Sequence, residues 1–183
     1  EYIMKKILDV ACGGEMFYFD KNDPRVLFCD IREVDTNLCD GRHFVVAPDV
    51  KCDFVALPFE DNTYRLVVFD PPHLLRNTGK SKFADMYGSV NEKATPTGYQ
   101  HIKYGALYGD WREMLSMGFA ECFRVLEPNG ILIFKWNETD IPVSKVLELT
   151  PEKPILGHRV GKLNKTHWLC FMKADADCME NKK

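Results

Sequence analysis

Short, mainly apolar runs that end at a turn or an acidic residue constrain this chain most. Three lie in its first seventy residues, at 7–10, 26–29 and 66–69, and a fourth follows at 131–134. Runs this short, without a regular polar face, are typical of strands that are buried on both sides of a sheet. Strands that alternate with longer connections indicate a parallel sheet with helices on both sides, so the pattern predicts an α/β fold.

The segments between these runs carry weaker signals. Asp110 is a plausible N-cap with Glu113 three residues on, which is the spacing of a capping box, and Pro128-Asn129-Gly130 would close that helix. The other signals predict short helices at 15–20 and 143–149, a weak strand at 50–54, and a terminal hairpin-like pair of strands at 155–159 and 166–172.

Residues 1–183 are expected to form one domain, because domains commonly hold roughly 100–200 residues. No apolar run approaches the roughly 18 residues of a membrane helix, and the first residues lack the apolar core of a signal peptide, so a cytoplasmic protein without a membrane partner is expected. The chain has 7 cysteines but no C-x-x-C pair. This favours reduced thiols over a disulfide framework or a zinc site, and no metal is expected.

Three groups of polar or turn residues follow the apolar runs: Asp9 with Gly13-Gly14, Asp30, and Asp70-Pro71-Pro72-His73. In an open parallel sheet, ligands bind outside the carboxyl ends of the strands, so these groups are expected to face one crevice. An acidic residue about 20 positions after a glycine turn is a typical acceptor for ribose hydroxyls, which predicts that role for Asp30. Asp9 is expected to hold the turn or to bind the amino group of an amino-acid moiety.

The glycine turn itself favours one class of nucleoside. It lacks a full G-x-G-x-x-G, and Glu15 places a negative charge where a pyrophosphate would need unobstructed backbone amides. This disfavours a dinucleotide. It is compatible with a nucleoside that carries a cationic tail without phosphate, as S-adenosylmethionine (SAM) does.

Several segments together resemble the motifs of class I (Rossmann-like) SAM-dependent methyltransferases. The segment ILDVACGGE resembles their first motif, VLFCDIRE the second, CDFVALPFEDNTYRLVVFDPPH the third and fourth, and GFAECFRVLEPNGILIFKW the segment that leads into the fifth strand. The resemblance covers roughly residues 7–172. It implies a three-layer α/β/α sandwich with a seven-stranded, mostly parallel sheet whose last strand is antiparallel.

The resemblance also implies SAM as the cofactor. Asp53 is similar to the residue that receives the adenine amino group, and Phe54 either lies beside the adenine ring or packs in the core. Ala11 and Glu15 stand where the family usually has glycine. The cofactor-binding residues that the resemblance implies are Asp9, Ala11, Cys12, Gly13, Asp30, Ile31, Asp53, Phe54 and Asp70.

The tetrapeptide Asp70-Pro71-Pro72-His73 resembles the Asp/Asn-Pro-Pro-aromatic signature of methyltransferases that modify planar amino nitrogens, as in adenine N6, cytosine N4 or a glutamine amide. Such a nitrogen is a poor nucleophile because its lone pair is delocalised. The carboxylate of Asp70 and the carbonyl of Pro71 can accept its two N–H bonds and hold it in line with the methyl group. Proline suits the site because it fixes φ and removes a competing donor. His73 stands in place of the stacking aromatic, where it stacks, takes up the released proton, or is a surface or capping residue.

Residues 74–109 have no periodicity and are predicted to be an irregular substrate loop or lid. Residues 74–112 contain six Lys and Arg residues but three Asp and Glu residues, and aromatic residues lie between the cations in the sequence. Candidate substrate contacts in this segment are Arg76, Lys80, Lys82 and Tyr104. A second basic segment, with Arg159, Lys162, Lys165 and His167, could flank the same crevice. Cations interleaved with aromatics suit a flipped-out nucleotide and its phosphates, although ordinary solvated surfaces can have the same composition.

The sequence therefore predicts a methyltransferase for an exocyclic amino group in nucleic acid, with adenine N6 or cytosine N4 of DNA as the first expectation. The length leaves little room for a separate target-recognition domain, so a partner subunit could supply that function. Two alternatives stay open. One is transfer to a protein glutamine amide or a small-molecule amine, and the other is a SAM-binding subunit without catalysis.

Overall fold

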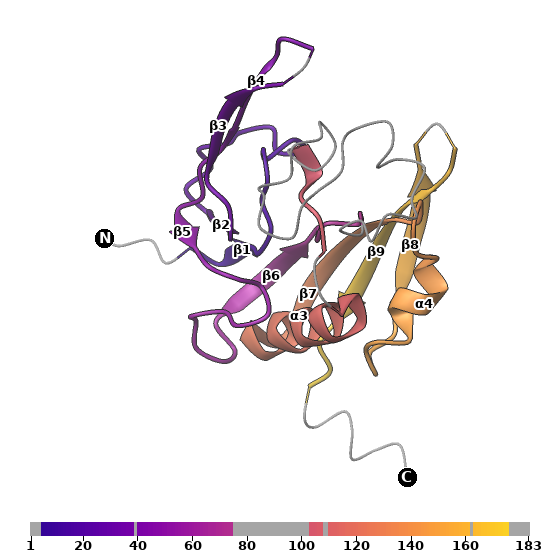
Figure 1. Cartoon of the computed structure of the whole chain (residues 1–183). Helices are drawn as coiled ribbons and strands as arrows, with labels where there is room; N and C mark the ends of the chain where they lie inside the picture. Colours follow the sequence, from indigo (N-terminus) through magenta and orange to yellow (C-terminus); the bar gives the residue numbers. More distant parts are fainter. Residues whose placement is uncertain (1–4, 39, 75–102, 108–109, 162, 176–183) are drawn as a thin grey trace.

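The computed structural model describes residues 5–38, 40–74, 103–107, 110–161 and 163–175. Its main sheet has seven strands in the order β5-β2-β1-β6-β7-β9-β8 (Figure 1). The strands are β1 (Ile7–Asp9), β2 (Val26–Asp30), β5 (Val50–Lys51), β6 (Tyr64–Phe69), β7 (Leu126–Asn137), β8 (Leu156–Val160) and β9 (Thr166–Met172). All neighbouring strands pair in parallel except β9, which is antiparallel to both β7 and β8. The mostly parallel sheet of seven strands with an antiparallel last strand is therefore confirmed.

The four apolar runs form the centre of this sheet. Leu8 on β1 pairs with Leu27 on β2 and Val67 on β6, and Val67 in turn pairs with Leu132 on β7. Leu8, Val67 and Leu132 are fully buried. The shortness of the runs follows from their position, because a strand that is covered on both faces needs only a few apolar residues to span the core.

Helix α3 (Trp111–Val125) covers one face of the sheet, and α4 (Val143–Leu147) follows β7 (Figure 1). The predicted N-cap of α3 is confirmed, since Asp110 accepts a hydrogen bond from the N–H of Arg112 at 2.9 Å. The apolar side of α3 packs on β6 and β7: the ring of Phe119 lies 4.8 Å from that of Phe134 and 5.5 Å from that of Phe69. The main core of the protein lies between this helix and the sheet.

In the described residues, the opposite face of the sheet is packed by the segment 11–25, from which Cys12 and Tyr18 contact Val26 and Phe28 of β2. A helix was predicted at 15–20, but the chain from 11 to 25 forms consecutive turns. Gly13 and Glu15 have φ values of 52° and 53°, in the left-handed region, and the carboxylates of Asp20 and Asp23 each accept the N–H of the residue two positions on. Too few residues remain between these turns to nucleate a helix. The prediction was therefore wrong for this segment.

A second, two-stranded sheet follows β2. Strands β3 (Val34–Asn37) and β4 (His43–Val46) form an antiparallel hairpin that rises from the main sheet at the top of Figure 1. Phe44 and Val46 are buried with Leu38, whereas His43 and Val45 are exposed. This hairpin was not predicted, because both strands are only four residues long and β3 is mainly polar, so neither gives a strong strand signal.

Strands β8 and β9 are antiparallel neighbours, which confirms the predicted hairpin-like pair of strands at 155–159 and 166–172. Among the helices that the structure describes, none is long and apolar enough to cross a membrane.

Candidate active site

Four aspartates line the carboxyl edge of the sheet. Asp30 ends β2 and Asp9 ends β1, while Asp53 follows β5 and Asp70 follows β6 directly. Because these strands are adjacent in the order β5-β2-β1-β6, the four residues lie along one edge in the order Asp53, Asp30, Asp9, Asp70. Neighbouring strands are about 4.8 Å apart, so this aspartate row spans roughly 14 Å. The chain also reverses its strand order between β1 and β6, which is where open α/β sheets bind ligands.

Asp9 lies under the glycine turn and is fully buried. Its carboxylate accepts the N–H of Ala11 at 3.1 Å and the O–H of Tyr18 at 2.8 Å. Burial, followed by the nearby carboxylates of Asp70 and Asp30, raises the pKa of Asp9 to about 7. Asp9 thus holds the turn, and near neutral pH its charge responds to whatever binds beside it.

The glycine turn is shaped by the elements packed around it. The N–H of Gly13 donates to the carboxylate of Asp30 at 2.9 Å, which ties the turn to the end of β2. A Cβ added at Gly14 would lie 2.7 Å from Cε2 of Phe44, so the β3–β4 hairpin closes tightly on this residue. Only glycine fits there without movement of the Phe44 ring.

Asp30 is almost fully buried, and both of its carboxylate oxygens already have donors. One oxygen accepts the N–H of Arg32 at 2.8 Å and its Nε–H at 3.1 Å, and the other accepts the N–H of Gly13. A ribose at Asp30 would therefore have to displace the side chain of Arg32. Ile31, beside it, is 43% exposed and offers an apolar surface at this point.

The two residues predicted for the adenine lie after β5. Asp53 accepts the N–H of Val55 at 3.1 Å and so holds the turn that follows. The ring of Phe54 lies in the main core, 5.2 Å from that of Phe69, and a Cβ added at Gly118 would lie 2.8 Å from its Cδ2. Of the two alternatives for the Phe54 side chain, core packing is what these contacts show.

The Asp70-Pro71-Pro72-His73 tetrapeptide leaves the sheet at the end of β6. Asp70 forms an ion pair with Lys135 on β7, with 2.6 Å between Oδ2 and Nζ. The ring of His73 lies 5.5 Å from that of Tyr104, at an angle of 52°. Burial, and then the positive charge of Lys135, lowers the pKa of His73 to about 4. His73 is therefore neutral at physiological pH.

The described end of the predicted substrate segment returns to this tetrapeptide. The N–H of Leu107 donates to the carbonyl of Leu74 at 2.8 Å, so the chain leaves and re-enters the domain at neighbouring points. Gly105 has a φ of 72°, and a Cβ there would lie 3.1 Å from Cγ of Pro72 and 3.3 Å from Cζ of Arg32. The predicted contacts Arg76, Lys80 and Lys82 lie outside the described residues. Tyr104 is the member of the predicted set that the structure brings to the site.

No protein-family model matches the sequence, and no curated protein is significantly similar to it. Solved structures do match. The crystal structure of the PH0226 protein from Pyrococcus horikoshii aligns with 94% of this chain and 84% of its own, with a TM-score of 0.50 and 16% identity. The chain has the Rossmann-like methyltransferase fold.

Two further matches are proteins whose described activity is methyl transfer. A TehB-like SAM-dependent methyltransferase from Corynebacterium glutamicum is 12% identical over 93% of this chain and 80% of its own, with a TM-score of 0.48. The 1,6-didemethyltoxoflavin-N1-methyltransferase of Burkholderia thailandensis, solved with S-adenosylhomocysteine, is 14% identical over 92% and 71%, with a TM-score of 0.47.

Lys135 is the main component of the site that the sequence analysis missed. It is the charged residue within an apolar strand segment, Ile131 to Trp136, and that contrast is the signal that could have identified it. Its partner Asp70 is 65 residues away in the sequence. Among the described residues, no group of three His, Cys, Asp or Glu could hold a metal ion.

The second basic segment lies at the same edge of the sheet but farther along it. β8 runs parallel to β7, so the turn from β8 to β9 is at the carboxyl edge, three strands from β6. His167 is buried there, with its Nε2 3.0 Å from a carboxylate oxygen of Glu138. Of the predicted members, Lys162 lies outside the described residues. One strand, β7, lies between His167 on β9 and the Asp70 end of the aspartate row.

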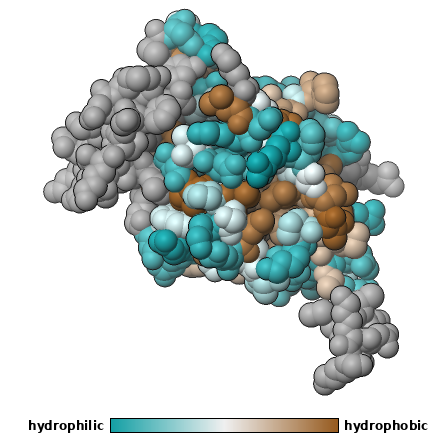
Figure 2. Space-filling model, turned by 90° about the vertical axis from the view of Figure 1, so that its right-hand side faces the viewer, coloured by the Kyte–Doolittle hydropathy of each residue, from teal (hydrophilic) through white to brown (hydrophobic). Residues whose placement is uncertain are grey.

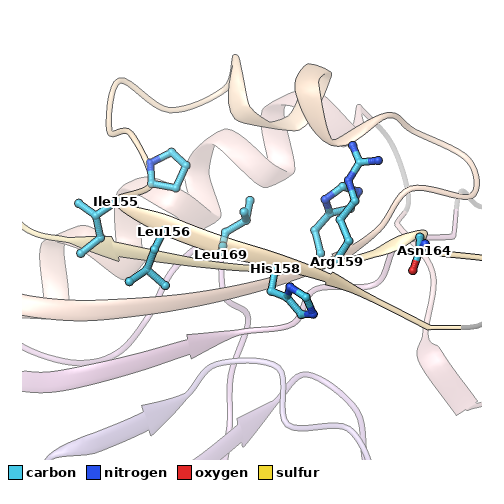
Figure 3. A pocket seen from close by; sticks show the side chains of 9 residues that line it. Ile155, Leu156, His158, Arg159, Asn164 and Leu169 are labelled. Atoms are coloured by element: carbon cyan, nitrogen blue, oxygen red, sulfur yellow. The ribbon is translucent and has the colours of Figure 1, made fainter.

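An open groove of about 780 Å³ runs along β8 and β9. Figure 3 shows Leu169 and Arg159 on one side of these strands and Leu156 and His158 on the other. Figure 2, which views the molecule from the side on which β8 lies in Figure 1, shows apolar side chains among hydrophilic ones. Ile155 and Leu156 are 59% and 65% exposed. The groove is lined by Pro154, Ile155, Leu156, Gly157, His158, Arg159, Asn164, His167 and Leu169.

Proposed function

We propose that the protein is a SAM-dependent N-methyltransferase that acts on the amino group of a planar acceptor, with adenine N6 or cytosine N4 of DNA as the substrate to test first. The observation that carries this proposal is the position of Asp70-Pro71 at the last place in the aspartate row, beside the reversal of strand order. An acceptor bound there would meet a cofactor laid along the other three aspartates.

The residues at the edge fit SAM in size and charge. An extended nucleoside with an amino-acid tail is similar in length to the roughly 14 Å of the aspartate row. Asp53 and Asp30 would hold the adenosine end, and Asp9 with the Gly13 turn would hold the cationic end. A buried carboxylate beside two others favours a cation, which supports SAM over a ligand with phosphate groups.

Methyl transfer needs the acceptor nitrogen to be aligned and its positive charge to be stabilised. SAM, when bound, supplies an electrophilic methyl group on a sulfonium. The Asp70 carboxylate and the Pro71 carbonyl accept the two N–H bonds, which directs the nitrogen lone pair toward that methyl carbon. With SAM bound, the nitrogen would take the methyl group as the carbon–sulfur bond broke with its electron pair on sulfur, and the nitrogen would then lose one proton to water. His73 is neutral, so it serves as a polar aromatic surface beside the acceptor.

Nucleic acid as the acceptor is supported by cation–aromatic pairs near the site. Lys103 lies over the ring of Tyr104 at 5.0 Å, and the guanidinium of Arg112 lies over the ring of Trp111 at 4.3 Å. Such pairs suit bases and phosphates together. A partner subunit that selects the target sequence belongs to the same proposal.

The direct test is mass spectrometry of nucleosides after DNA and RNA are incubated with the protein and SAM that carries a deuterated methyl group. We expect label on an exocyclic amino nitrogen, lost in Asp70→Ala and retained in Asp35→Asn, whose side chain is exposed on the hairpin. Label on protein or on a small amine would instead support the alternative acceptors. Absence of any thermal stabilisation by SAM or its demethylated product would refute the cofactor assignment, since a ligand of the native state must stabilise it.

A further inference from the structure

The ion pair between Lys135 and Asp70 lies at the point where the acceptor would bind. Nζ of Lys135 is 2.6 Å from Oδ2 of Asp70, and both side chains are about three-quarters buried, with exposed fractions of 27% and 23%. Lys135 reaches Asp70 from β7, the strand next to β6. A charge-assisted hydrogen bond of this length fixes the orientation of the carboxylate.

Two aromatic rings also lie near the ammonium group of Lys135. Nζ lies 5.3 Å from the ring centre of Phe17 and 5.7 Å from that of Trp168. The two rings meet edge to face, with 5.3 Å between their centres. Trp168 is the direct cross-strand partner of Lys135. Cation–π contacts of this kind restrict where the ammonium can go, so it stays at Asp70.

The charge state of Asp70 depends on this neighbour. Burial raises the pKa of Asp70, and Lys135 is the cation that opposes this effect. Among the described residues, two other ionisable groups near Asp70 give no such help: Asp9 on β1 is a carboxyl group, and His73 in the same tetrapeptide is neutral. Without Lys135, the buried carboxyl would hold its proton to higher pH.

If Asp70 were protonated, its O–H would donate a hydrogen bond at the point where the N–H of the methyl-accepting nitrogen needs a hydrogen-bond acceptor. Lys135 also repels the positive charge that develops on the nitrogen. Keeping Asp70 ionised matters more than this repulsion, because a donor facing the N–H of the reacting nitrogen would remove the alignment of that nitrogen. The same cation disfavours an acceptor that is already positive, such as an alkylammonium group.

We propose that Lys135 is a positioning residue that holds Asp70 as an oriented anion, with Oδ1, which accepts no hydrogen bond from the described residues, available to the acceptor, and that Lys135 restricts the site to uncharged amino groups. This inference rests on the proposed function for its catalytic meaning. The ion pair itself can be tested whether or not an acceptor has been found.

The first test follows the Asp70 carboxyl by carbon NMR during a pH titration, with Asp70→Asn to assign the signal. In Lys135→Met the midpoint should rise by about 1–3 pH units, and Lys135→Arg should restore it. Lys145→Met is the matched control, because Lys145 pairs with Glu148 on the surface of α4. An unchanged midpoint in Lys135→Met would overturn the inference. Lys135→Gln gives a second neutral variant if the Met variant is unstable to urea.

The second test measures kcat/KM against pH for the acceptor that the nucleoside analysis identifies. The acid limb should move to higher pH in Lys135→Met by the same interval as the NMR midpoint, while the Kd for SAM stays the same. A uniform fall in kcat/KM at all pH values, without movement of the limb, would contradict the role given to Lys135. If the NMR midpoint shifts but the wild type methylates nothing, the ion pair stands and the proposed function fails.

Discussion

Asp9 should make the stability of this protein depend on pH in an unusual direction. Its pKa is raised from 3.8 to about 7 in the folded protein, chiefly by burial. Below pH 3.8 the carboxyl is protonated in both the folded and the unfolded chain, so it adds no pH-dependent cost. Between 3.8 and 7 only the unfolded chain ionises, and the free energy of unfolding falls. The shift of about three units corresponds to a loss of about 4 kcal/mol that is complete above pH 7.

Asp9→Asn should remove this dependence without removing the contacts. The amide oxygen can still accept the N–H of Ala11, and the amide N–H can donate to the hydroxyl of Tyr18. Urea denaturation of both proteins from pH 4 to pH 8 gives two curves, and groups common to both cancel in their difference. Between pH 4 and pH 8, the free energy of unfolding of Asp9→Asn relative to that of the wild type should rise by about 4 kcal/mol.

The control is Asp20→Asn, which changes an exposed carboxylate that accepts a single backbone N–H in the same segment. Its difference curve should stay flat within about 0.5 kcal/mol, as is usual for a surface substitution. A flat difference for Asp9→Asn as well would refute the reasoning, because it would mean that burial does not hold the proton on Asp9.

Three other predictions concern the core, the tetrapeptide and the cofactor. Gly118→Ala should cost about 1–3 kcal/mol in urea denaturation, because the new Cβ would lie 2.7 Å from Cζ of Phe69 and 2.8 Å from Cδ2 of Phe54; an unchanged midpoint would show that the rings move aside freely. The pKa of His73 is about 4, so the plot of kcat/KM against pH for the wild type should have no inflection near pH 6.5 that arises from His73. The plots for the wild type and His73→Phe should therefore have the same shape in that range. SAM should bind with release of a proton from Asp9 near pH 7, measured by calorimetry in two buffers of different ionisation enthalpy, and Asp9→Asn should release none.

The sheet could be predicted where local sequence and tertiary environment agree. The run Val67 to Phe69 is apolar and is buried between neighbouring strands, and Asp110 begins α3 with its own side chain. The helix predicted at 15–20 was wrong, because the conformation of this segment depends on Gly13 and Glu15 in left-handed backbone and not on apolar periodicity. The β3–β4 hairpin was missed for a different reason, since its strands are short and β3 is mainly polar.

Side-chain contacts between distant strands could not be read from the sequence. The strand ends predicted that Asp9, Asp30 and Asp70 would share an edge, and the strand order agrees. Nothing local to Lys135 says that it reaches Asp70, since that contact exists only when β6 and β7 pair in their observed register. Phe54 illustrates the opposite case, where a residue beside a motif serves the core.

The hydrogen bond between Leu74 and Leu107 has a consequence for how the length of the chain between them can change. Both residues are buried, so the chain on either side of residues 75–106 is fixed to the domain at two adjacent points. The entropic cost of closing a flexible loop grows slowly, by about 0.6 kcal/mol for each doubling of its length. A longer or shorter chain between these two points would therefore change the free energy of folding only slightly. The strand order that sets the aspartate row would stay as it is.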